Sequence, residues 1–501
     1  MRDHGEHEAA SAGSRLPTGS WVTVLRGTFS QLRGRVQRFE VATRPDNPEA
    51  TAAHARRWAG LPEGVKTPAQ VLGRKFTGCE GTHGVFPACN FGCEPCYHGA
   101  EANRVPIDGE HTVAEVDRQM ELLRRLRGPG QYAQLIGGEV SLLPPEAHGQ
   151  ALAVMRRHQR IPMSFSHGDF DDDYLEAVVL DEHGERRFDD ISFAVHIDST
   201  MKGRRAVKLP TSESELHGER ARVAAMFGRL YQRHGIRSYL AHSMTVTPDN
   251  VHEIPEVVRV CRQLGYRMCS FQPAAYVGDE QRWADGYRRL TDEAVWAEVE
   301  RGVGRRLPFR AMQPGDERCN RSTWGAWVGR RYVPILDDLD DRDLLARDAY
   351  FRAVPEPQRA DPWQVKGTRI GRAMLADLPA AARLARWGLR FAKRAVTGPR
   401  HGQAVRSRHR VLATTYVMHR FMDGDDVRRA WELMERGIEG DDPTTLETQQ
   451  RLQACVYGMA HPGSERIVPA CVQHSVLDPG ENQQLIQLLP PRRAERSPRT
   501  R

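Results

Sequence analysis

The sequence has few cysteines and no long apolar run. Nine cysteines in 501 residues are too few for a disulfide-stapled scaffold, and their number is odd. No stretch of about 18 apolar residues occurs, which excludes a membrane-spanning helix, and residues 1–13 lack the apolar core of a signal peptide. These absences predict a cytoplasmic protein, either free or in peripheral contact with a membrane.

The net charge of +7 is concentrated in two segments. Residues 366–410 contain twelve Lys and Arg and one acid, Asp377, and residues 492–501 contain five Arg and one acid. The rest of the chain is mildly acidic, which argues against a nucleic-acid-binding protein. Residues 368–396 have the period of a basic amphipathic helix, which either contacts an anionic membrane or lipid substrate or is solvated and packed on the body.

The length and the changes of pattern divide the chain into segments. The expected division is a disordered tail at 1–20, an N-terminal extension at 21–78, an α/β domain at 79–300, a C-terminal extension at 301–490 and a basic tail at 491–501.

Short β-prone runs alternate with amphipathic helical stretches between residues 80 and 300, which is typical of a parallel α/β architecture. The predicted strands are 84–87, 132–136, 162–166, 191–198, 237–246 and 266–273. Thr112 begins a capping-box sequence for one helix, and Asp249 or Asn250 precedes another that ends at Gly265. Six strands with intervening helices predict an open or closed barrel, with its chemistry at the carboxyl ends of the strands.

Three cysteines lie in one short loop after the first predicted strand. Cys89, Cys93 and Cys96 have the spacing C-x3-C-x2-C. Thiolates this close together favour an iron–sulfur cluster or zinc over harder ions. The loop has no fourth cysteine, so a zinc site would need His83 or His98 to complete it.

This loop resembles the cluster-binding motif of the radical S-adenosylmethionine (radical SAM) superfamily. A second match is Gly137-Gly138-Glu139, which ends the second predicted strand forty-one residues after the third cysteine. The resemblance implies a partial (β/α)6 TIM-like barrel in which the three cysteines hold a [4Fe-4S] cluster with one open iron. S-adenosylmethionine would bind that iron, and the Gly-Gly-Glu motif would line the site beside its amino group.

The resemblance also implies a reaction. One-electron reduction, by a donor such as a flavodoxin or ferredoxin, would cleave S-adenosylmethionine and give a 5′-deoxyadenosyl radical that abstracts hydrogen from an unactivated carbon. In the superfamily the residue before the third cysteine is often aromatic and packs on adenine. Pro95 stands there in this sequence. Tyr97 is the candidate to take that role, and the alternative is a tyrosine of the core.

Later stretches resemble the tetraether lipid synthase group and its relatives among radical methylases. The matching stretches, at strand ends and near the C-terminus, are Ser166-His167-Gly168, His196-Ile-Asp198, Ser270-Phe-Gln272-Pro-Ala and His419-Arg-Phe-Met-Asp423. The candidate ligand-binding residues among them are Ser166, His167, Asp198 and Gln272. That group joins unactivated hydrocarbon chain ends, which implies a lipid or another long apolar substrate. The alternatives are a radical enzyme acting on a peptide or an RNA, and a non-enzymatic iron–sulfur or zinc protein.

Six cysteines lie outside the loop. Cys261 is on an apolar helical stripe and Cys269 is within a predicted strand, so we expect both in the core. Cys79 precedes the loop by ten residues, as an extra cysteine does in the tetraether group, and two cysteines near the C-terminus also match that group. The remaining set is Cys79, Cys319, Cys455 and Cys471. These four either hold a second [4Fe-4S] cluster in an iron–sulfur-binding C-terminal extension or are unrelated thiols.

Overall fold

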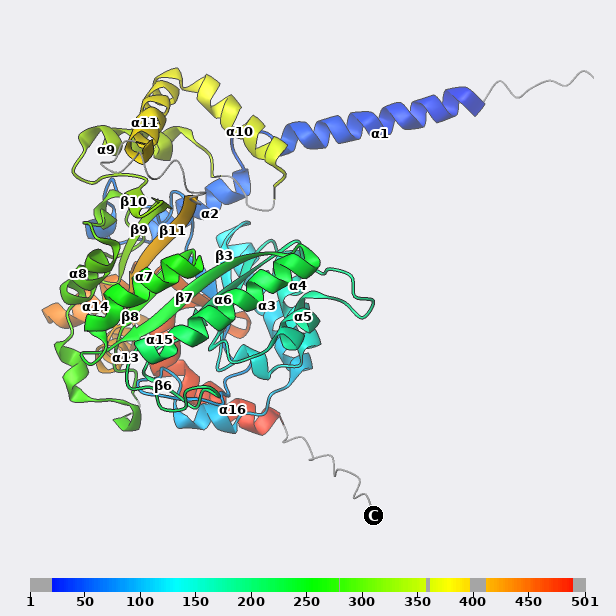
Figure 1. The fold of residues 1–501 in the computed structure, drawn as a ribbon. Helices are drawn as coiled ribbons and strands as arrows, with labels where there is room; N and C mark the ends of the chain where they lie inside the picture. The colour runs from blue at the N-terminus through cyan, green and yellow to red at the C-terminus, as the bar shows by residue number, and fades with distance from the viewer. Residues whose placement is uncertain (1–19, 279, 357–360, 397–410, 490–501) are drawn as a thin grey trace, which may run out of the picture.

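The computed structural model describes residues 20–278, 280–356, 361–396 and 411–489. Residues 1–19 of the expected tail at 1–20, the expected tail at 491–501 and part of the basic segment lie outside these ranges, and Ser20 begins a helix. The first described element is α1 (Ser20–Ala42), which extends away from the body of the molecule (Figure 1).

The body is built on one open sheet, which has eleven strands in the described residues. Eight neighbouring strands, from β12 through β8 to β11, run parallel, and the strands beyond them are antiparallel to their neighbours. The spatial order is β10 (Arg331–Pro334), β9 (Asn320–Val328), β11 (Val411–His419), β8 (Met268–Pro273), β7 (Arg237–Val246), β5 (Asp190–His196), β4 (Ile161–Ser166), β3 (Tyr132–Leu135), β1 (Cys79–Gly81), β12 (Tyr457–His461) and β13 (Arg466–Pro469).

Six neighbouring strands follow one another in chain order, and a helix comes after each of them. These strands are β1, β3, β4, β5, β7 and β8. These helices are α3 (Gly109–Arg127), α4 (Pro145–Arg157), α5 (Asp172–Val179), α6 (His217–His234), α7 (Ile254–Leu264) and α8 (Asp292–Val303). The main apolar core lies between these strands and helices and includes Leu135, Phe193 and Met226. The predicted α/β class is confirmed.

The predicted first strand at 84–87 is wrong, because the structure places β1 at Cys79–Gly81. Gly84 has a left-handed backbone, with φ of +62°, and Pro87 offers no N–H to a neighbouring strand. The buried centre of β1 is the charged residue Glu80, whose carboxylate accepts two 2.7 Å hydrogen bonds from Arg160. This buried ion pair hides the strand from a search for apolar runs.

Two of the predicted helix starts also differ. Asp108, not Thr112, caps α3 by accepting the N–H of His111 at 2.9 Å. The side chain of Asn250 accepts the N–H of Thr247, and α7 begins only after a short 3-10 turn at Val251–Glu253. The predicted end of α7 is confirmed, because Gly265 adopts φ of +86°.

The C-terminal part of the chain extends the sheet at both edges, since β11 pairs with β8 and β12 pairs with β1. The predicted helix at 368–396 is two helices, because Asp377 separates them and accepts the N–H of Ala380. The remaining helices are α2 (Pro48–Ala59), α9 (Asp341–Ala353), α10 (Trp363–Ala376), α11 (Leu378–Val396), α13 (Gly424–Glu435), α14 (Pro443–Gln453), α15 (Ala470–Val472) and α16 (Asp478–Leu488). None of the helices in the described part of the chain is long and apolar enough to cross a membrane.

Candidate functional site

The cysteine loop is attached to the body at both of its halves. The backbone N–H of Cys89 donates to Asn103 Oδ1 at 2.8 Å. Cys93 lies in the short strand β2 (Gly92–Cys93), which pairs with β6 (Met201–Lys202) beyond the carboxyl end of β5. The loop is therefore held in place by the chain itself.

The three thiols of the loop are half-buried and close enough to interact. Burial raises the pKa of Cys89 to about 12 and that of Cys93 well above its usual value, and the neighbouring cysteines add to both shifts. The guanidinium of Arg282 opposes the shift in the pKa of Cys93. These shifts favour the protonated form of Cys89 and Cys93, and a bound metal ion would displace the proton. Three sulfur donors in one partly exposed loop, with a guanidinium nearby, fit a cluster bound by three cysteines.

The Gly-Gly-Glu motif after β3 packs directly against the segment that leads into the loop. The N–H of Gly138 donates to Phe86 O at 2.7 Å, and the N–H of Glu139 donates to Ala88 O at 2.9 Å. A Cβ on Gly138 would lie 2.1 Å from Ala88 O, so only glycine allows this approach. The carbonyl of Gly137 accepts a 2.8 Å bond from His98 Nε2. These contacts fix the start of the cysteine loop to the end of β3.

The carboxylate of Glu139 joins the ends of β3 and β4. It is 1 % exposed and accepts hydrogen bonds from Ser141 N at 2.9 Å, Ser166 Oγ at 2.7 Å and His167 N at 2.8 Å. A carboxylate can accept about four hydrogen bonds, and the chain's own groups donate three to Glu139. Glu139 therefore links the end of β3 to the end of β4.

Replacing Glu139 with glutamine should lower the free energy of unfolding by about 1–3 kcal/mol, because an amide N–H₂ would face a donor instead of accepting from it. Denaturant unfolding of E139Q measures this loss. The control is E146Q, since Glu146 is 55 % exposed and pairs with Arg187 at the surface; its expected change is under about 1 kcal/mol. Equal stability of E139Q and wild type would contradict the positioning role.

His167 connects the end of β4 to the cysteine loop. Its Nε2 lies 2.9 Å from Asn90 Oδ1, and its ring stacks on Phe91 with 3.9 Å between the ring centres. Arg204 donates to the carbonyl of His167 at 2.9 Å and lies over the Phe91 ring. Ser166 and His167, both proposed from the sequence, are thus in contact with the loop or with Glu139.

Asp198 follows β5 and is fully buried. It accepts from the backbone N–H groups of Thr200 at 2.9 Å and Thr245 at 2.7 Å, and its Oδ2 lies 2.7 Å from His196 Nε2. It is close enough to raise the pKa of Cys93 by charge repulsion. Asp198 therefore lies beside the loop, with its oxygens engaged by neighbouring strand ends.

Tyr97 and Gln272 are placed differently. The hydroxyl of Tyr97 donates to Gly137 O at 3.4 Å, and its ring packs at 4.3 Å from His474, within an interior cluster. Gln272 lies half-buried on β8, in register with Thr245 of β7. Tyr97 thus contacts the Gly-Gly-Glu motif, while Gln272 lies three strands away from β4.

The four other candidate cysteines come together, although 392 positions of sequence separate the first from the last. Cys79 begins β1, Cys319 precedes β9, Cys455 precedes β12 and Cys471 lies in α15. Burial raises the pKa of Cys79 and of Cys319 to about 11, and proximity to Cys455 adds to both shifts. Burial also raises the pKa of Cys471, and proximity to Cys455 and Cys319 adds to this shift.

Three arginines surround this four-cysteine cluster. Arg451 Nε donates to Cys319 Sγ at 3.2 Å. Arg57 donates to the carbonyl of Cys455 and Arg127 to that of Cys79, both at 2.7 Å. Guanidinium groups stabilise thiolates, so they favour a negatively charged sulfur site here. By contrast, Cys261 and Cys269 are at most 1 % exposed in the apolar core, as predicted.

A further group of side chains with metal-binding atoms could not be predicted from the sequence. His461 and Glu481 lie beside His83, which the sequence suggested only as an added ligand for the cysteine loop. The available signal was weak: His461 ends a short apolar run, and Glu481 stands in a polar C-terminal stretch. Only the folded chain brings these residues together.

No protein-family profile and no curated protein matches the chain. Among solved structures, native anSMEcpe with bound AdoMet shows 14 % identity and a TM-score of 0.30 over 44 % of this chain and 57 % of its own length. SuiB of Streptococcus suis bound to S-adenosylmethionine shows 10 % identity and a TM-score of 0.28 over 40 % of this chain and 41 % of its own. The matching region thus covers little more than half of the first relative and less than half of the second.

Proposed function

We propose that the protein is a radical SAM enzyme. The observation that carries this proposal is the three-cysteine loop, held at the carboxyl ends of β3, β4 and β5 by the Gly-Gly-Glu motif and His167. In parallel α/β folds this edge is where ligands bind. We further propose that residues 79–300 form the radical SAM partial barrel and that residues 301–490 are its C-terminal extension.

In this proposal Cys89, Cys93 and Cys96 would hold a [4Fe-4S] cluster, and S-adenosylmethionine would bind beside them. Together these groups would supply radical chemistry at an unactivated carbon. The chain's own residues contribute geometry: Asn103 and β6 hold the loop, and Glu139 holds two strand ends together. Because Glu139 and Asp198 have their oxygens engaged within the protein, we assign them positioning roles.

The test is anaerobic reconstitution of the full-length protein with iron and sulfide, followed by addition of S-adenosylmethionine and a low-potential reductant. The expected product is 5′-deoxyadenosine. Protein that binds zinc at one per chain, takes up no iron or sulfide and forms no 5′-deoxyadenosine would instead be a non-enzymatic metal protein.

We also propose that the four-cysteine cluster holds a second [4Fe-4S] cluster. Four sulfur donors complete the ligand set of an ordinary cluster without an open iron. Arg57, Arg127 and Arg451 offset part of its negative charge. Such a cluster would serve electron transfer or structure, with reducing equivalents supplied by a small donor such as a flavodoxin or ferredoxin.

For the substrate we propose a lipid or another long apolar molecule, and we propose separately that the protein contacts an anionic membrane surface. Helices α1, α10 and α11 lie at the opposite end of the molecule from α16 (Figure 1). Their large exposed apolar side chains are Leu32, Val36, Phe39, Val41, Trp363, Leu375, Leu378, Leu389 and Val396. Exposed cations such as Arg35, Arg38, Arg383 and Arg386 stand between them. Exposed apolar groups interleaved with cations are suited to an anionic lipid surface.

Replacing Leu378 and Leu389 together with glutamine should weaken binding to vesicles that contain anionic phospholipid at least tenfold, since each buried leucine contributes about 1.5–3 kcal/mol. Vesicle co-sedimentation measures this change. The matched control is the double variant of Leu209 and Leu488, which are 70 % and 65 % exposed, against 65 % and 74 % for the tested pair. Equal binding by both variants, or binding of RNA that falls steeply with salt, would favour a peptide or RNA substrate.

A further inference from the structure

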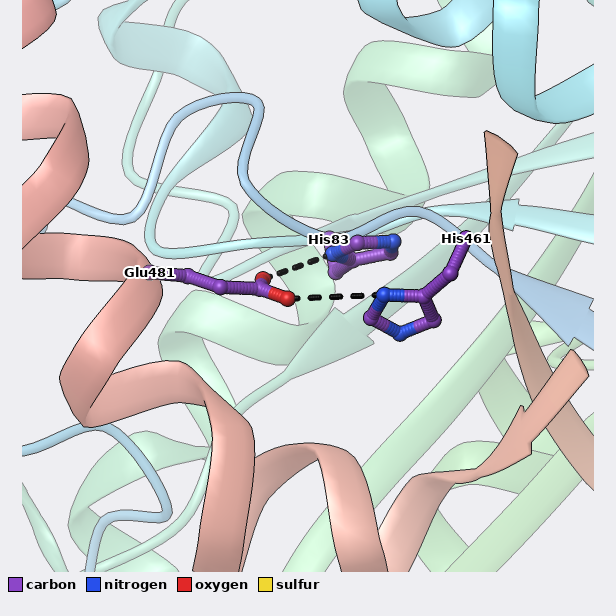
Figure 2. Close-up of side chains that lie close together, drawn as sticks. All are labelled: His83, His461 and Glu481. Carbon is purple, nitrogen blue, oxygen red and sulfur yellow. Dashed lines mark hydrogen bonds and ion pairs between the residues drawn. The ribbon is translucent and has the colours of Figure 1, made fainter. Parts of the chain in front are cut away.

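Two histidines and a glutamate from three distant segments meet beside the carboxyl end of β12. His83 lies just after β1, His461 is the last residue of β12, and Glu481 is on α16. Their side-chain ligand atoms all lie within 4.8 Å of one another. Figure 2 shows the carboxylate of Glu481 facing both imidazole rings. Because β1 and β12 are parallel neighbours, their carboxyl ends bring the two histidines together.

The outer nitrogen of each ring is occupied by an acceptor of the protein. His83 Nε2 donates to the carbonyl of Ala460 at 2.7 Å. His461 Nε2 lies 2.7 Å from Gln473 Oε1. The amide nitrogen of Gln473 donates to the carboxylates of Asp478 and Glu481, both at 2.9 Å, which orients its oxygen toward His461. Both Nε2 atoms therefore carry the ring proton.

The inner nitrogens of both rings face the same carboxylate. His83 Nδ1 is 2.8 Å from Glu481 Oε2, and His461 Nδ1 is 3.5 Å from Glu481 Oε1. The rings are stacked, with 4.1 Å between their centres. The two inner nitrogens and the carboxylate offer three ligand atoms that face one another, and a divalent cation can displace the proton shared by His83 and Glu481 and contact all three.

The geometry points to a single divalent transition-metal ion bound by His83 Nδ1, His461 Nδ1 and Glu481. A tetrahedral zinc site with bonds of about 2.1 Å requires ligand atoms about 3.4 Å apart. The two His–Glu distances here are 2.8 and 3.5 Å, and all three ligand atoms lie within 4.8 Å of one another. The hydrogen bonds that the outer nitrogens donate to Ala460 O and Gln473 Oε1 are the supporting contacts that metal-binding histidines have. Glu481 is 25 % exposed, so the site has an entry path and room for a fourth ligand.

This site differs in chemistry from the cysteine sites, and it is independent of the proposed radical SAM function. Nitrogen and oxygen ligands bind zinc or iron(II), whereas the thiolate sets favour clusters. Its position also gives it a structural effect. The ion would link α16 and β12 to the segment between β1 and the cysteine loop, six residues before Cys89.

The test uses full-length protein with its clusters already built, to which Zn²⁺ is added. After gel filtration the wild type should retain about one zinc per chain, and the zinc absorption edge should show nitrogen or oxygen at about 2.0–2.1 Å. E481Q and H461A should bind zinc at least tenfold more weakly. Zn²⁺ should also raise the midpoint of thermal unfolding of the wild type and leave that of E481Q unchanged.

The matched control is H158A, which removes a histidine whose Nε2 lies 2.5 Å from Asp117 at the surface. It should bind zinc like the wild type, as should the variant lacking the three loop cysteines. The proposal is overturned if the wild type retains no zinc, if E481Q binds as tightly as the wild type, or if the bound zinc has only sulfur neighbours at about 2.3 Å.

Discussion

Replacing Cys89, Cys93 and Cys96 together with alanine should abolish formation of 5′-deoxyadenosine from S-adenosylmethionine. The loop has three thiols and its backbone is anchored by Asn103 and β6, so the variant loses every sulfur donor while keeping its attachments. Iron and sulfide content should fall by one cluster, or about four iron atoms per chain. Anaerobic reconstitution, metal counting and chromatography of the reaction mixture measure these changes.

The control for this variant is C261A. Cys261 is fully buried in the apolar core, so its loss should reduce stability modestly through a small cavity and leave the iron content unchanged. If the triple variant still cleaves S-adenosylmethionine while C261A behaves like the wild type, the loop is not the cluster site. The radical SAM proposal would then fail.

Replacing Cys319 and Cys471 together with alanine should lower the iron content from about eight to about four atoms per chain. Both thiols are buried and interact with Cys455, so the variant removes half of the four-cysteine cluster. Cleavage of S-adenosylmethionine in the presence of a chemical reductant should persist, because the loop cysteines are untouched. This separation of iron content from cleavage distinguishes the two proposed sites.

The control for the second cluster is C269A, which removes another buried cysteine without touching either site. A wild-type protein that reconstitutes with only about four iron atoms per chain would contradict the second cluster. Zinc bound at the four cysteines, with an unchanged iron content in the double variant, would contradict it as well.

The central strands could be predicted from the sequence with small errors. The predicted strands at 132–136, 162–166 and 237–246 correspond to β3, β4 and β7. These strands have apolar or alternating runs, and the pattern shows because apolar side chains face the core. β1 could not be predicted in this way, because its buried centre is Glu80 and the partner, Arg160, lies eighty residues away.

The candidate site also has one part that could be predicted from the sequence and one part that could not. The spacing of Cys89, Cys93 and Cys96 places three thiols in one loop whatever the rest of the chain does, because eight residues cannot separate them far. The role of Glu139 could not be read from its motif, since its hydrogen-bond partners come from β4. Gly138, the residue before it, allows the backbone after β3 to pack closely against the backbone at Ala88.

The sequence by itself determined the α/β class and the three-cysteine loop, because both depend on neighbours within a few residues. Tertiary structure alone brought together the four other cysteines and the group of His83, His461 and Glu481. The physical reason is that β12 pairs with β1 across more than 370 residues, and this pairing places the C-terminal segment beside the first strand of the sheet. No local pattern encodes which strands become neighbours at that distance.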